Sequence, residues 1–81
     1  MFFIFSQRAK DDYHQLGKSL QKLADKQLSF LIKNLRHPSL RAKKYDEGLD
    51  VWQARINQDH RFYFRIGGDA YEILTIARHP K

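Results

Sequence analysis

The sequence contains no cysteine, only two prolines and four glycines, and no long apolar run. The missing cysteine excludes disulfide bonds and thiolate metal sites, so apolar and aromatic side chains, or a partner's surface, must hold the fold together. The apolar residues at 1–5 are too few for a signal peptide or a membrane span, and no basic residue precedes them. We therefore expect a cytoplasmic protein, which agrees with the lack of cysteine.

Size and charge narrow the possibilities further. The 81 residues are enough for one domain over 1–81, in which roughly 60% of the surface of the unfolded chain becomes buried. Fifteen Lys and Arg residues against nine Asp and Glu residues give a formal net charge of +6. This excess favours a polyanionic partner such as nucleic acid, with an acidic protein as the alternative.

The first half of the chain predicts a strand followed by a helical hairpin. Residues 2–5 are β-formers, and Ser6 is a suitable N-cap for the helix after them. Apolar residues then recur at helical spacing in two stretches that are separated at Gly17, and the second stretch ends before Pro38. Residues 38–50 lose this periodicity and predict a loop.

The predicted loop has a basic and aromatic tip formed by Lys43, Lys44 and Tyr45. Lysines can hold backbone phosphates and a tyrosine can stack on an unpaired base, which is how single-stranded RNA is often bound. We assign these residues, together with Tyr63, to RNA binding. A solvated charged loop is the alternative interpretation.

The last thirty or so residues alternate with a period of two and predict a three-stranded antiparallel meander. The fold class is therefore α+β in the order β-α-α-β-β-β, with the helices on one face of the sheet. A three-residue loop at 58–60 would place Arg55 opposite Tyr63. A four-residue loop at 67–70 would place Phe64 opposite Ile73 and Arg65 opposite Glu72.

The face opposite the helices is predicted to carry Arg55, Arg61, Tyr63 and Arg65, with Arg78 joining them at the end of the last strand. Arginine suits phosphate binding because its planar fork contacts two oxygens and keeps its proton. The four histidines are scattered without zinc-ligand spacing, so we expect neither a metal nor another cofactor.

Three segments resemble the RelE/ParE toxin superfamily: Val-Trp-Gln-Ala-Arg-Ile at 51–56, Arg-Phe-Tyr-Phe at 61–64, and Ile-Ala-Arg-His-Pro-Lys at 76–81. The resemblance implies a small ribonuclease that acts on messenger RNA, usually in the ribosomal decoding site, and is silenced by an acidic antitoxin. It also implies that basic side chains on the open face of the sheet hold the phosphates while the 2′-hydroxyl attacks.

By this resemblance Arg55 and Arg61 occupy catalytic or phosphate-binding positions, and Arg78 and His79 match a basic C-terminal segment. We expect His79 to be the general acid or base, since imidazole titrates near neutrality. It would replace a tyrosine or histidine that several members carry further along the chain. Gln53 stands where some members have a lysine.

Two alternatives remain open within the same fold. ParE-like relatives act on DNA gyrase and lack ribonuclease activity, and a non-catalytic member would bind RNA without cutting it. The combination of Arg55, Arg61 and His79 favours cleavage, because a surface directed at gyrase does not need an acid or base beside phosphate-binding arginines.

Overall fold

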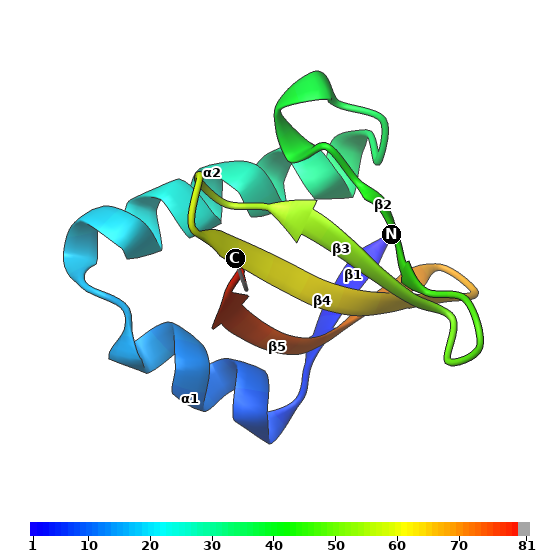
Figure 1. Ribbon diagram of the computed structural model, residues 1–81, viewed down its shortest axis with the longest axis horizontal. Helices are drawn as coiled ribbons and strands as arrows, with labels where there is room; N and C mark the ends of the chain where they lie inside the picture. The colour runs from blue at the N-terminus through cyan, green and yellow to red at the C-terminus, as the bar shows by residue number, and fades with distance from the viewer. Residues whose placement is uncertain (80–81) are drawn as a thin grey trace.

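The computed structural model describes residues 1–79, which form one sheet with two helices packed on one of its faces (Figure 1). Pro80 and Lys81, which end the predicted C-terminal segment, lie outside the described residues. The elements are β1 (Phe2–Phe5), α1 (Gln7–Gln15), α2 (Lys18–Lys33), the short 3-10 helix η1 (Pro38–Leu40), β2 (Lys43–Asp46), β3 (Val51–Arg55), β4 (His60–Gly67) and β5 (Ala70–Arg78). The predicted α+β class is confirmed.

The sheet differs from the prediction in two ways. Its strand order is β1-β5-β4-β3-β2, with β1 parallel to β5 and the other neighbours antiparallel, so the sheet is mixed. The helices and strands β2–β4 lie between β1 and β5 in the chain and supply the long connection that a parallel pair requires. Strand β2 lies within the region predicted as a loop, because an edge strand held by backbone pairing to β3 does not need alternating apolar residues.

The helical hairpin begins and turns close to the predicted positions. The hydroxyl oxygen of Ser6 accepts a hydrogen bond from the Ala9 amide at 3.0 Å, as expected of an N-cap, and the hydroxyl donates to the Leu74 carbonyl of β5 at 2.7 Å. Leu16 is the C-cap of α1, and Gly17 is the N-cap of α2. None of the helices within residues 1–79 has the length and apolar character needed to cross a membrane.

The core lies between the helices and the face of the sheet that carries alternate residues of β3, β4 and β5. Its largest fully buried side chains are Phe62, Phe64, Leu31, Leu40 and Ile73. Each such side chain contributes about 1.5–3 kcal/mol through removal from water. Trp52 is half-buried and packs against this cluster.

A β-bulge in β5 changes the predicted alternation. Phe64 pairs with Ile73, as predicted, but Tyr63 pairs with Thr75, which leaves Leu74 as an additional residue on β5. The residues that follow therefore exchange faces relative to the simple alternating pattern.

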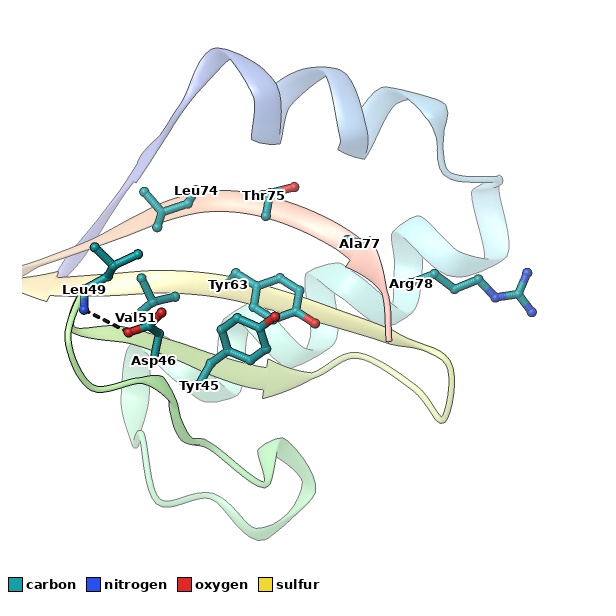
Figure 2. A pocket seen from close by; sticks show the side chains of 9 residues that line it. All are labelled: Tyr45, Asp46, Leu49, Val51, Tyr63, Leu74, Thr75, Ala77 and Arg78. Carbon is teal, nitrogen blue, oxygen red and sulfur yellow. Dashed lines mark hydrogen bonds between the residues drawn. The ribbon is translucent and has the colours of Figure 1, made fainter. Parts of the chain in front are cut away.

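The consequence of the bulge is greatest at the end of β5. Ile76 is buried in the core, whereas Ala77 lines a hollow on the open face. Arg78 pairs with His60 and therefore faces the same side of the sheet as Ile76, the opposite side from Ala77. It reaches the open face only at the edge of the hollow, and its guanidinium extends away from the hollow (Figure 2). The prediction that Arg78 joins the open-face arginines is therefore corrected.

Candidate functional site

Arg55 on β3 and Arg61 on β4 lie directly opposite each other on the face of the sheet that the helices do not cover. The sequence placed Arg55 opposite Tyr63, but Tyr63 pairs with Gln53. The predicted pairing of β3 with β4 is therefore wrong by two residues. Two like charges in cross-strand register destabilise a sheet. No carboxylate forms an ion pair with either arginine among residues 1–79, so a bound anion would relieve their repulsion.

The register follows from the turn between β3 and β4. The Ile56 amide donates to the His60 carbonyl at 3.0 Å, and this bond closes the turn one residue earlier than predicted. The side-chain oxygen of Asn57 accepts from the amides of Asp59 at 2.9 Å and His60 at 2.8 Å. An asparagine that satisfies two turn amides fixes the loop geometry, and this selects the Arg55–Arg61 pairing.

Arg61 folds over this turn. Its Nη1 donates to the carbonyls of Asn57 at 2.6 Å, His60 at 3.0 Å and Gln58 at 3.3 Å. No partner among the described residues engages its Nε or Nη2, so these donors remain available on a guanidinium whose position is already fixed. An ion pair with Asp59, the simplest structural alternative, is not formed in the described part of the chain.

His79 is tied to the same turn. Its backbone amide donates to the Asp59 carbonyl at 2.6 Å. The ring Nδ1 is buried and has no hydrogen-bond partner among residues 1–79. The turn therefore contacts the guanidinium of Arg61 and the backbone of His79, and Arg55 lies opposite Arg61 across the strands. These are the three residues that the sequence favoured for cleavage.

Beside this basic group the open face is hollowed over a volume of about 350 Å³ (Figure 2). Tyr45 of β2 and Tyr63 of β4 form one wall, with ring centroids 4.9 Å apart and planes at 67°. The rest of the lining consists of Asp46, Leu49, Val51, Leu74, Thr75, Ala77 and Arg78. An apolar hollow with an aromatic wall can receive a flat ring such as an unstacked base.

Tyr63 connects the hollow to the arginines. Burial raises the pKa of Tyr63, the neighbouring Tyr45 raises it further, and the charge of Arg61 opposes the rise. The phenol therefore keeps its proton at neutral pH and can donate a hydrogen bond to a group held beside Arg61.

The predicted RNA-binding group at 43–45 is divided by its strand. Lys43 pairs with Gln53 on the open face, whereas Lys44 pairs with Trp52 on the helix-covered face. The Lys44 ammonium lies 5.3 Å from the Trp52 ring centroid and forms ion pairs with Asp50 and Glu47. The hydrogen bond that Lys44 donates to Asp50 is the main cause of the raised pKa of Lys44. Its position is thus set by local contacts and not by the open face.

Residues 3–80 match the family model described as the ParE toxin of the type II toxin–antitoxin system, parDE. The chain belongs to the ParE toxin family. The resemblance to the RelE/ParE superfamily seen in the sequence is thereby confirmed. No curated protein matches the chain.

Solved structures show the same fold for this toxin. A YoeB/ParE toxin from Agrobacterium tumefaciens is 16% identical with a TM-score of 0.83, covering 99% of this chain and 100% of its own. A chain of the YoeB–YefM complex from Staphylococcus aureus is 23% identical with a TM-score of 0.78, and the match covers 96% of this chain and 95% of that chain. The isolated E. coli RelE toxin is 14% identical with a TM-score of 0.77, and the match covers 99% of this chain and 85% of the RelE chain.

Sequence reasoning did not select Gln53 of this toxin as a site residue. It lies at the centre of the open face between Lys43 and Tyr63, is only 6% exposed, and has a buried Oε1 without a partner in the described part of the chain. A polar residue in the middle of a central strand was the available signal. Among residues 1–79 no group of three His, Asp or Glu side chains could hold a metal ion.

Proposed function

We propose that this toxin is an endoribonuclease that cleaves messenger RNA in the cytoplasm. The observation that carries the proposal is the Arg55–Arg61 pair, which lies in cross-strand register on the open face with no carboxylate paired to it among residues 1–79. Such a pair can hold a phosphate in a bidentate manner and stabilise the additional negative charge of a pentacoordinate transition state.

The proposed reaction uses the RNA's own 2′-hydroxyl as the nucleophile. The 2′-oxygen loses its proton and bonds to phosphorus, and the bond from phosphorus to the 5′-oxygen breaks as that oxygen takes up a proton. The products are a 2′,3′-cyclic phosphate and a 5′-hydroxyl. In this scheme His79 transfers one of the two protons, while Arg55 and Arg61 supply the positive charge that a metal would otherwise provide.

The hollow beside the arginines would hold an unstacked base. Tyr45 and Tyr63 supply the aromatic wall, and Lys43 on the neighbouring edge strand can contact a phosphate of the same strand. The open face thus offers a base site and a phosphate site side by side, which suits single-stranded RNA and not a duplex. A message presented by the ribosome meets this condition.

The partner that silences the toxin would be an acidic antitoxin. A related fold from Staphylococcus aureus was solved as a YoeB–YefM complex and one from E. coli as a RelBE toxin–antitoxin complex. We expect an acidic segment to lie over Arg55 and Arg61 or along the helical hairpin, since a net charge of +6 favours it. The association should weaken as the salt concentration rises.

Purified toxin incubated with RNA tests the proposal, with EDTA when the RNA is free and with Mg²⁺ when the RNA is presented on ribosomes. Cleavage that leaves 2′,3′-cyclic phosphate and 5′-hydroxyl ends, and that is lost in Arg55→Gln, supports it. Intact RNA under both conditions would refute it. The antitoxin serves as a control, because its addition should stop the cleavage.

A second candidate is inhibition of DNA gyrase, and it is favoured by the match to a family model that carries the ParE name. A supercoiling assay with purified gyrase separates the two functions. Inhibition of gyrase at toxin concentrations that leave RNA intact would establish this alternative, and Arg55→Gln would then leave inhibition unchanged.

A further inference from the structure

A second basic concavity lies where the end of β3 meets α2 and η1. This groove has a volume of about 580 Å³. Its cations come from three separate parts of the chain: Lys26 from α2, Arg41 from the residue after η1, and Arg55 from the end of β3. Asn57 and Gln58 of the β3–β4 turn complete its far side.

The floor of the groove is rigidly built. Gln27 is 5% exposed, and its amide nitrogen donates to the Arg55 carbonyl at 2.7 Å and to the Ser39 carbonyl at 3.1 Å. The Ser39 hydroxyl donates back to the Gln27 side-chain oxygen at 3.3 Å. One buried side chain therefore fixes α2, η1 and β3 relative to one another, so the backbone positions that carry the groove cations are fixed.

The charge of the groove is not balanced locally. No acidic side chain lines it, and Lys26, Arg41 and Arg55 form no ion pair among residues 1–79. Lys44 provides the contrast, because Asp50 and Glu47 neutralise it. Uncompensated cations around one concavity attract an anion with several charges.

Arg55 joins the groove to the open face. It lies opposite Arg61 in the sheet and also lines the groove, so the two basic regions adjoin at Arg55. We propose that the groove binds backbone phosphates of the same single-stranded RNA beyond the nucleotide that is cleaved. This inference rests on the proposed ribonuclease function and assigns Lys26 and Arg41 to holding the RNA, not to the chemical step.

An acidic peptide is the competing occupant. Stable peptide docking depends on buried apolar or aromatic anchors. Among the described residues that line the groove, Leu23 is the one large exposed apolar side chain, at 39% exposure. The lining is otherwise cationic and polar, which suits a sugar–phosphate backbone better.

Two charge-removing variants test the inference. Lys26→Gln combined with Arg41→Gln removes the groove cations, and Arg8→Gln combined with Lys10→Gln removes one arginine and one lysine from the exposed surface of α1. The probes are single-stranded 2′-O-methyl RNAs, which cannot be cleaved, of about 4 and about 12 nucleotides. Affinities are measured over a range of salt concentrations.

We expect the groove variant to bind the long probe about tenfold more weakly at low salt, with a slope of log affinity against log salt reduced by about 1.4, or 0.7 for each lost phosphate contact. Binding of the short probe and cleavage of short unmodified RNA should not change. The α1 control should behave like the parent with both probes. Arg41→Lys should retain most of the affinity, because it keeps the charge.

Equal affinity of the groove variant and the α1 control for the long probe would overturn the inference. So would an equal loss with short and long probes, or a groove variant that loses affinity for an acidic peptide but not for RNA. A parent protein that binds the long probe through the groove but cuts no RNA would support the inference and refute the endonuclease proposal. Absence of binding to either probe would refute both.

Discussion

Arg61 and His79 bind backbone carbonyls of the same turn: the Arg61 guanidinium holds those of Asn57, Gln58 and His60, and the His79 amide holds that of Asp59. The guanidinium of Arg61 and the backbone of His79, which are distant in sequence, thus share one support. Any change that loosens this turn should displace both groups, so their effects on activity should not be additive.

Substitutions of Arg55 and Arg61 should have different effects on the stability of the protein, although both residues lie on the open face. Arg61→Gln removes a guanidinium nitrogen that holds three carbonyls, and we expect a loss of about 1–2 kcal/mol in the free energy of unfolding together with loss of RNA cleavage. Arg55→Gln should abolish cleavage without lowering the free energy of unfolding. The described residues provide no hydrogen-bond partner for the Arg55 side chain, and removing one of two facing charges relieves repulsion. Urea unfolding and an RNA cleavage assay distinguish the two. Equal stabilities would show that the Arg61 contacts contribute nothing.

His79→Gln should lower the rate of RNA cleavage by more than tenfold, about 1.4 kcal/mol, while leaving RNA affinity within about twofold. A proton-transfer group acts in the transition state and adds little to ground-state binding. His14→Gln, on the exposed face of α1, is the matched control and should cleave like the parent. A His79→Gln protein that retains activity within about threefold would remove His79 from the chemical step.

The sequence predicted most of the fold because its period-two and helical patterns mark residues that face the core. It predicted the Phe64–Ile73 pair because the turn after β4 contains consecutive glycines. It missed β2, in which Lys43 and Lys44 give no apolar alternation. It also missed the bulge at Leu74, since an additional residue in a strand has no signal in hydrophobic pattern alone.

The candidate site was predicted in part for the same reasons. Arg55 and Arg61 fall on the expected face because side chains alternate along a strand, whatever the register. Their direct pairing depends on Asn57 accepting two turn amides, a tertiary detail that composition does not reveal. The placement of Arg78 failed because it depends on the bulge.

The stability of the toxin should fall at alkaline pH. Burial raises the pKa values of Tyr63 and Tyr71 above 10.0, and a hydrogen bond to Asp25 raises that of Tyr13. Above pH 10 the unfolded chain releases phenolic protons that the folded chain retains, so this stability is complete below pH 10 and is lost as pH rises through the folded pKa values.

Tyr71→Phe should make the decline in unfolding free energy between about pH 9 and pH 11 shallower, as measured by urea unfolding at each pH. Lys44, whose pKa is also raised, contributes with the same sign, so the decline should not vanish. A decline that is as steep in Tyr71→Phe as in the parent would show that this phenol is not protected by folding.

The two buried glutamines should respond oppositely to the same substitution. Gln27 bridges the carbonyls of Ser39 and Arg55, so Gln27→Met leaves two carbonyls without their donor and should cost about 2 kcal/mol. Gln53 has a buried Oε1 without a partner among residues 1–79, so Gln53→Met removes an unsatisfied acceptor and should raise the unfolding free energy by about 1 kcal/mol. Methionine has nearly the shape of glutamine, which limits packing differences between the variants. Urea unfolding of both variants tests this prediction. A destabilised Gln53→Met would mean that the Gln53 Oε1 does find a donor in solution. Tyr63 and Lys43, which pair with Gln53 on the neighbouring strands, are the candidates.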